Sequence, residues 1–335
     1  MRVSISWLKQ LVQVNESVDD LSERLSMAGF EVDDVDDLSA RAQGVVVGHV
    51  LEREKHPNAD KLSVCKVDVG AQVPIQIVCG ASNVRAGIHV PVAMVGATLP
   101  AVGLTIKAGE LRGVASNGMI CSLSELGLTE QSDGIAILDE LDESLPPNGS
   151  PVAPLLGLDD TVLELAITAN RPDGLSMVGI AREVAALTGG SLSLPELDLN
   201  PSTTPLTTEL DGCFYTITRI EGVDGSKPSP TWLQQRLERG GVNSVNVVVD
   251  VTNLVMLEQG QPLHAFDADA LEQLTGQPVD AKSFAVRSAR NGEIFVGLDD
   301  QKRTLDSRVQ VVTCHDRLVA VAGVMGSLES GVTSS

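Results

Sequence analysis

A run of seven residues, His56-Pro57-Asn58-Ala59-Asp60-Lys61-Leu62, is the most specific candidate for chemistry in this sequence. Proline fixes its own φ angle, and asparagine and aspartate favour turns, so the run predicts a tight, projecting loop. Lys55, Lys61 and Lys66 would bring positive charge to the same rim. Barrels with such a rim bind oligonucleotides on one face and its adjoining loops. The alternative is a hairpin turn with solvated charges, and the pattern supports the two interpretations equally.

A second candidate combines Asn253, the histidine of Gln261-Pro262-Leu263-His264, and the turn Ala322-Gly323-Val324-Met325-Gly326. A histidine there could position water or contact a sugar hydroxyl, and a glycine in the turn would let the backbone approach a ligand closely. The residue types alone favour a plainer interpretation, in which His264 packs a loop.

Other kinds of site are poorly supported. His56 with Asp60, or His315 with Asp316 and Cys314, do not supply three or four metal ligands at a recognised spacing. No glycine-rich phosphate loop opens a helix, and no serine or cysteine lies in a nucleophile-elbow motif. A metal-dependent hydrolase of nucleotides is therefore an interpretation without a ligand cluster, and no metal site is predicted.

The distribution of charge limits how this chain could meet nucleic acid. A net charge of −21 argues against coating nucleic acid by bulk attraction. Residues 40–115 nevertheless contain eight lysines and arginines against five acids, whereas residues 113–170 contain ten acids and no basic residue of either kind. One basic segment between acidic neighbours is compatible with a single anionic partner that docks at one place.

Length and composition predict a globular protein. A chain of 335 residues, 43% hydrophobic and 21% charged, is expected to form two or three domains. No run approaches the roughly 18 apolar residues of a membrane span, and no signal peptide is recognisable, so no membrane partner is expected. Five cysteines without disulfide or zinc spacing favour a cytoplasmic location. The chain ends directly after a core-like strand at 318–324, so we expect the sequence to be cut from a longer one.

Alternating hydrophobic residues predict the element that carries the loop. Short strands are expected at 45–50, 64–69, 75–79, 90–94 and 105–107, with glycines marking the turns or bulges between them. Such a series of short strands indicates a small closed or partly closed barrel, with His49 in its wall.

Helices and strands are expected on both sides of the barrel. Ser17 predicts the start of a helix that ends at Gly29, and a later helix ends at Gly189-Gly190. The last region is expected to hold a strand at 214–218, a helix at 230–239 with Trp232, Leu233 and Leu237 inward, and a buried strand at 245–251.

Short motifs make residues 44–128 resemble the tRNA-binding barrel of bacterial phenylalanyl-tRNA synthetase beta subunits. They are Gly44-Val-Val-Val-Gly-His-Val50, the run from His56 to Leu62, Ile77-Val-Cys-Gly-Ala81 and Gly118-Met-Ile-Cys-Ser-Leu-Ser-Glu-Leu-Gly127. The same barrel occurs in a few free-standing tRNA-binding proteins. Four further runs extend the likeness to the beta subunit: Ala169-Asn-Arg-Pro-Asp173, Gly179-Ile-Ala-Arg-Glu-Val-Ala185, Val248-Val-Asp-Val-Thr-Asn253 and Gly260-Gln-Pro-Leu-His-Ala-Phe-Asp267.

The resemblance implies an α+β multidomain fold. An OB-fold tRNA-binding β-barrel at 40–150 would be inserted in a small α/β domain made of 1–39 plus 151–190. A linker at 191–209 would lead to a mixed α/β editing domain at 210–335, which would be incomplete at its C-terminus.

The resemblance also implies a function within a larger enzyme. A partner alpha subunit would attach phenylalanine to tRNA(Phe) with ATP and Mg²⁺, in an (αβ)₂ heterotetramer. This chain would bind tRNA and contribute the editing site that hydrolyses Tyr-tRNA(Phe), and no cofactor is expected on its own residues. Editing is needed because an apolar pocket rejects a near-isostere with an extra hydroxyl by only about a hundredfold.

Individual residues take their expected roles from the same resemblance. The catalytic set would be His264, Asn253 and Thr252, and Pro262, Ala322 and Gly323 would line the editing pocket. The tRNA-binding set would be Lys55, His56, Pro57, Asn58, Lys61, Lys66 and Arg85. The glutamate that recognises the tyrosine hydroxyl is expected beyond Ser335.

A rival from another functional class is a non-enzymatic module that binds or chaperones tRNA. It predicts affinity for tRNA without hydrolysis, and such a chain could end after Leu128. The motifs in the following two hundred or so residues favour the synthetase subunit.

Overall fold

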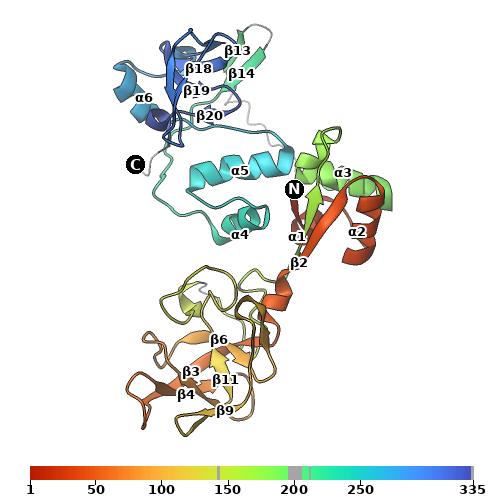
Figure 1. Ribbon diagram of the computed structural model, residues 1–335, viewed down its shortest axis with the longest axis vertical. Helices are drawn as coiled ribbons and strands as arrows, with labels where there is room; N and C mark the ends of the chain where they lie inside the picture. Colours follow the sequence, from red (N-terminus) through yellow and green to blue (C-terminus); the bar gives the residue numbers. More distant parts are fainter. Residues whose placement is uncertain (142–143, 195–205, 211–212, 333–335) are drawn as a thin grey trace. The chain divides into compact units, whose positions relative to one another are not determined.

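The computed structural model describes residues 1–141, 144–194, 206–210 and 213–332, and Figure 1 shows their secondary structure. The chain divides into two compact units. Unit 1 combines Met1–Val32 with Leu165–Ser335, and unit 2 is the intervening segment Asp33–Glu164. In the described part of the chain, no helix has both the length and the hydropathy to cross a membrane.

Unit 2 is built on a five-stranded antiparallel sheet with the order β11-β6-β3-β4-β5. The strands are β3 (Val45–Lys55), β4 (Ser63–Asp68), β5 (Ile75–Cys79), β6 (His89–Met94) and β11 (Gly118–Ile120). The buried apolar side chains of the sheet belong to two clusters: Val50, Val67 and Ile77 are fully buried in one, and Val47 of β3 is fully buried in the other. The backbone N–H of Asn117, just before β11, donates to the carbonyl of Gln76 in β5. The two edge strands, β5 and β11, therefore meet, and the sheet is nearly closed.

Four of the predicted barrel strands are confirmed, and the fifth prediction is wrong. The predicted strand at 105–107 is replaced by β8 (Leu104–Thr105), which pairs with β7 (Thr98–Leu99) outside the main sheet. The fifth strand of the sheet is β11 instead. A hairpin of β9 (Gly109–Leu111) and β10 (Val114–Ser116) lies between them in the chain. These short strands could not be predicted, because their glycine-rich sequence contains too few alternating apolar residues for a strand pattern to be recognised.

The first part of unit 1 follows the capping signals in the sequence. It contains β1 (Arg2–Ser4), α1 (Ile5–Leu11), α2 (Val18–Met27) and α3 (Met177–Thr188), and the chain passes between the units in β2 (Glu31–Asp37) and β12 (Thr161–Ala166). The Ser17 hydroxyl accepts the N–H of Asp20 at the start of α2. Gly189 ends α3 with a φ of 76°, a left-handed conformation that glycine adopts without strain. Both predicted caps are confirmed.

Among its described residues, the second part of unit 1 has three α-helices and a four-stranded sheet with the order β15-β18-β19-β20. Its helices are α4 (Thr231–Arg239), α5 (Val247–Gln259) and α6 (Ala268–Thr275). Its strands are β13 (Leu206–Leu210), β14 (Cys213–Ile217), β15 (Phe284–Ser288), β16 (Ile294–Val296), β17 (Lys302–Thr304), β18 (Gln310–Cys314), β19 (Arg317–Val321) and β20 (Met325–Gly326). The core-like segment at 318–324 is largely β19, which pairs on both sides and buries Val319 completely.

Two predictions in this part are wrong. Residues 245–251 do not form a buried strand, because α5 starts at Val247 and the Asn246 side chain accepts the N–H groups of Val248 and Val249. Trp232 does not face inward: 53% of its surface is exposed, while Leu233 and Leu237 are buried as expected. The predicted linker also overlaps β13, and its residues 195–205 lie outside the described ones.

Candidate functional site

His56 shapes the candidate RNA-binding loop from within. Only 2% of its surface is exposed. Its Nδ1 accepts the backbone N–H of Asn58 at 3.0 Å, and its Nε2 lies 3.0 Å from the carbonyl oxygen of Leu111. Because a carbonyl can only accept, we place the ring proton on Nε2, which leaves a neutral imidazole with both nitrogens satisfied. The side chain of His56 is thus a structural element of the loop.

The loop is attached to the β9–β10 hairpin by side chains. Besides the bond from His56 to Leu111, the Asn58 side-chain amide donates to the carbonyl of Arg112 at 2.9 Å. The backbone N–H of His56 closes the loop on the carbonyl of Leu62. Residues more than fifty positions apart therefore form one surface.

Most lysines and arginines predicted to contact tRNA are already in ion pairs. Exposed pairs join Lys55 to Asp60 at 3.0 Å, Lys66 to Glu52 at 2.6 Å and Arg85 to Glu140 at 3.4 Å. The hydrogen bond to Glu52, together with its charge, raises the pKa of Lys66. Lys61 is exposed and makes no ion pair with the described residues. Pro57 and Asn58 are exposed beside it. Lys61 is therefore the predicted cation best able to neutralise an external phosphate.

Sequence reasoning missed three comparable cations. Arg53, Lys107 and Arg112 have exposed side chains, and within the described ranges none of these side chains has an ion pair or hydrogen bond. The available signal was their place in the basic segment 40–115. Pairing between neighbouring strands, which separates free from neutralised cations, could not be read from that segment.

His264 packs against the turn that was predicted to accompany it. Its ring meets Phe266 edge-on, with centroids 4.6 Å apart, and lies over Gly326, where a side chain would collide with the imidazole. Desolvation by the surrounding atoms lowers the pKa of His264 although part of the residue remains exposed. A neutral imidazole is the form that can accept a proton from water.

The remaining predicted editing residues lie on three segments. Ala322 and Gly323 form the turn between β19 and β20, with Gly323 at a φ of 68°, and Pro262 is exposed two residues before His264. Thr252 and Asn253 lie within α5, where the Thr252 hydroxyl donates to the Val249 carbonyl at 2.7 Å. Among the described residues, no hydrogen bond joins these two to His264 or to the turn. The structure thus brings His264 to the turn but gives it no direct bond to Thr252 or Asn253.

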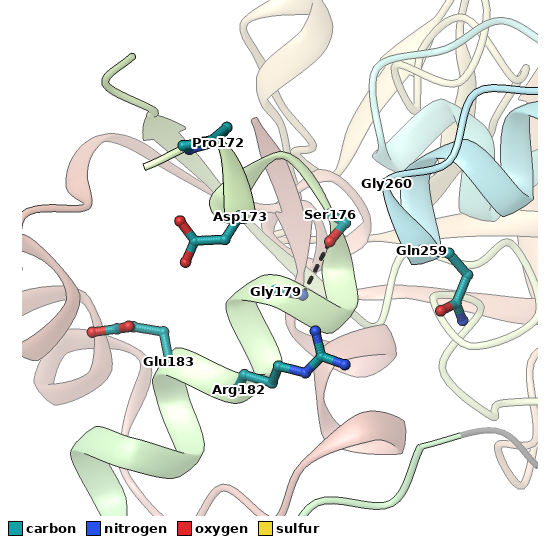
Figure 2. A pocket seen from close by; sticks show the side chains of 8 residues that line it. All are labelled: Pro172, Asp173, Ser176, Gly179, Arg182, Glu183, Gln259 and Gly260. Carbon is teal, nitrogen blue, oxygen red and sulfur yellow. Dashed lines mark hydrogen bonds between the residues drawn. The ribbon is translucent and has the colours of Figure 1, made fainter. Parts of the chain in front are cut away.

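A polar cavity of about 290 Å³ lies beside α3. Figure 2 shows its lining: Pro172, Asp173, Ser176, Gly179, Arg182, Glu183, Gln259 and Gly260. Ser176 caps α3 by accepting the N–H of Gly179 at 3.0 Å.

Both carboxylates of this cavity are engaged by Arg171. Its guanidinium bonds Asp173 at 3.1 Å and Glu183 at 2.7 Å and lies 4.2 Å over the ring of Phe30. The motif from Ala169 to Asp173 supported only the family resemblance in the sequence. In the structure its Arg171 has a structural role, because it joins Asp173 to Glu183 of α3.

Metal and thiol chemistry have no visible site in the described part of the chain. No group of three or more His, Cys, Asp or Glu residues there could hold a metal ion. Cys65, Cys79, Cys121 and Cys314 are buried free thiols. Desolvation raises the pKa of Cys65 to about 11 and that of Cys121 to about 12, so these thiols stay protonated and unreactive.

Two family models match the chain. Residues 45–147 match the family described as "Putative tRNA binding domain", and residues 212–335 match the family described as "B3/4 domain". The first match contains the loop from His56 to Leu62 and the nearly closed sheet. The second match contains His264 and the turn at Ala322 and Gly323.

Similar proteins match along the whole chain. The phenylalanine–tRNA ligase beta subunits of Synechococcus sp. strains CC9605 and CC9902 are 97% and 73% identical to it over 335 residues. Each match covers 100% of this chain and 42% of the relative, so the chain spans less than half the length of these curated relatives. The crystal structure of the C-terminal domain of Plasmodium vivax p43 is 31% identical over 23% of this chain and 43% of its own. Its TM-score of 0.19 is too low to show a shared fold.

Proposed function

Because the chain belongs to the phenylalanine–tRNA ligase beta subunit family, we propose that unit 2 binds tRNA and that the B3/4 region takes part in editing. The substrate of editing is Tyr-tRNA(Phe), which the region hydrolyses at its ester bond. The alternative, a tRNA-binding module without enzymatic activity, predicts binding but no hydrolysis.

The tRNA-binding half of the proposal is carried by one observation: the loop from His56 to Leu62, which is hydrogen-bonded to the β9–β10 hairpin, lies on the nearly closed sheet. The loop lies within the residues that match the tRNA-binding family. His56 holds it, and Lys61 has no ion pair with any residue that the structure describes. A five-stranded sheet whose ends meet at β5 and β11 supports an OB-fold barrel, an architecture that binds oligonucleotides on one face. In this proposal the side chains of His56 and Asn58 set the loop shape, and the exposed Lys61 and Pro57 face the RNA.

The contact of His264 with the turn at Gly326 supports the editing half. The lowered pKa keeps the imidazole neutral, so it can orient or deprotonate the water that attacks the tyrosyl ester. Ala322 and Gly323 would offer backbone groups to the substrate, with Pro262 at the edge and Thr252 and Asn253 from α5. The remaining wall and the group that reads the tyrosine hydroxyl are assigned to the part of the subunit outside this chain.

Charging itself is assigned to a partner alpha subunit within an (αβ)₂ heterotetramer. ATP and Mg²⁺ are needed for that reaction, and no residue of this chain is proposed to hold them. The buried free thiols suit the reducing cytoplasm in which such an enzyme would work.

Lys61→Gln is expected to weaken tRNA binding and to lower the slope of log affinity against log salt concentration by about one. The reason is that an unpaired lysine releases a counterion from RNA when it neutralises a phosphate. Binding of tRNA(Phe) to the 335-residue chain, measured by fluorescence anisotropy over a salt series, tests this.

Lys66→Gln is the matched control, because it removes the same charge from a lysine already paired with Glu52. Its effect on the salt slope should be clearly smaller. Equal slopes for both variants would show that the loop lysine has no special contact, and a wild-type chain without salt-dependent binding would refute the tRNA-binding proposal.

A further inference from the structure

The tip of the β9–β10 hairpin places an arginine in a costly backbone conformation. Arg112 has a φ of 51° and Gly113 a φ of 81°, the pair of positive angles that a two-residue hairpin turn of type I′ requires. Asparagine, aspartate or glycine normally fills the first position, because other side chains pay for the left-handed region. Such strain is concentrated at functional positions, which points to a functional role for the side chain of Arg112.

The hairpin is held on both of its strands. On one side the His56 ring and the Asn58 amide bond the carbonyls of Leu111 and Arg112 at 3.0 and 2.9 Å. On the other side the side chain of Gln76 donates to the carbonyl of Ala115 at 2.8 Å, and the Ser116 hydroxyl accepts the N–H of Val78 at 3.0 Å. The backbone of Arg112 is therefore fixed relative to the loop that carries Lys61.

Two cations lie at this junction without a neutralising partner in the described part of the chain. The side chains of Arg112 and Lys61 are both exposed and make no ion pair within the described residues, whereas Lys55 and Lys66 nearby are paired. Two free cations on two elements tied by side-chain hydrogen bonds can engage neighbouring phosphates without reordering of the backbone. A guanidinium also offers phosphate a planar, two-pronged donor that lysine lacks.

We infer that Arg112 is a second phosphate contact for RNA, presented beside Lys61 by the hairpin, and that His56 and Asn58 are positioning residues for it. This inference rests on the proposed binding of tRNA by unit 2. It extends the RNA-binding surface from the loop to the β9–β10 hairpin, which the loop motif does not include.

Arg112→Gly separates binding from folding, because glycine tolerates the φ of 51°. We expect affinity for tRNA(Phe) to fall about three- to tenfold, and the salt slope to fall by about one, while the midpoint of thermal unfolding is unchanged or raised. Arg112→Lys should keep the salt slope but lose part of the affinity, because lysine keeps the charge and lacks the planar fork. Arg308→Gln serves as the charge-matched control, since Arg308 is exposed, paired with Asp306 and in unit 1. An Arg112→Gly variant that binds like Arg308→Gln would overturn the inference.

A double-mutant cycle tests the positioning role of Asn58. Asn58→Ala alone should weaken binding, and it should have no further effect in the Arg112→Gly background, since the side chain that it positions is gone. Additive losses would overturn the positioning role. Failure of the wild-type chain to bind tRNA in a salt-dependent way would refute the proposed function, whereas normal wild-type binding with an unaffected Arg112→Gly variant would refute this inference alone.

Discussion

Replacing His264 with alanine in a complete phenylalanine–tRNA ligase is expected to slow the hydrolysis of Tyr-tRNA(Phe) by about a hundredfold or more, with phenylalanine charging unchanged. A positioned proton acceptor contributes roughly 10²- to 10⁴-fold to such reactions. The imidazole is held against the turn at Gly326, and its lowered pKa keeps it neutral. The rate of deacylation of preformed Tyr-tRNA(Phe), measured beside the rate of charging, gives the result.

The matched control is Leu263→Ala, which changes the exposed neighbouring side chain and should leave both rates near those of the wild type. The pH profile adds an independent test: because the pKa is lowered, the neutral form persists below the ordinary titration range of histidine, and deacylation should fall only in more acidic solution. Equal loss of charging and deacylation in His264→Ala would indicate damaged folding and contradict an editing role.

Asp250→Ala is expected to destabilise unit 1 by about 3–5 kcal/mol. This carboxylate in α5 is 0% exposed and accepts hydrogen bonds from the Ser229 and Ser244 hydroxyls and, at 2.8 Å, from the backbone N–H of Val245. The substitution leaves these buried donors without their acceptor. Both tryptophans of the chain, Trp7 and Trp232, lie in unit 1, so urea unfolding followed by their fluorescence reports the relevant unit.

The stability difference between the wild type and Asp250→Ala should become smaller at acidic pH. Desolvation would raise the pKa of Asp250, but the hydrogen bonds from Ser229, Ser244 and Val245 outweigh it, and the pKa is lowered. A carboxyl group with a lowered pKa stabilises the fold above its unfolded pKa and loses that contribution as the pH falls through its folded pKa. Asp269→Ala, at an exposed carboxylate of α6, is the control and should cost far less. Comparable losses of stability in the two variants would contradict a stabilising role for the buried hydrogen bonds of Asp250.

The helix α5 shows where hydrophobic pattern gives the wrong element. Val247, Val248 and Val249 are β-branched and predict a strand. The deciding residues are polar ones on either side, since Asn246 caps the first turn and Asp250 ties the preceding segment to it. Capping of this kind depends on which backbone groups a side chain can reach, and one hydrophobic run does not contain that information. The barrel strands were predictable because their alternation is itself the burial pattern.

The candidate sites were predictable in their motifs but not in their electrostatics. The loop from His56 to Leu62 was recognised locally, yet its partner at Leu111 and Arg112 is distant in sequence. The pairing of Lys66 with Glu52 arises because β3 and β4 set these residues opposite each other. Strand register decides which charges are free, and register follows from the folded sheet. The roles of Thr252 and Asn253 in editing stay predictions.

The division of unit 1 into two stretches of sequence has a consequence for how the chain is made. The amino group of Met1 donates to the carbonyl of Leu165 at 2.6 Å, across 164 positions. Ribosomes add about 5–20 residues per second, so the first residues wait on the order of ten to thirty seconds before that partner is synthesised. All of unit 2 is synthesised in the meantime. Val3, Trp7 and Leu8, which are almost completely buried in the finished fold, are exposed to chaperones throughout that interval, and unit 2 has the opportunity to fold on the ribosome first.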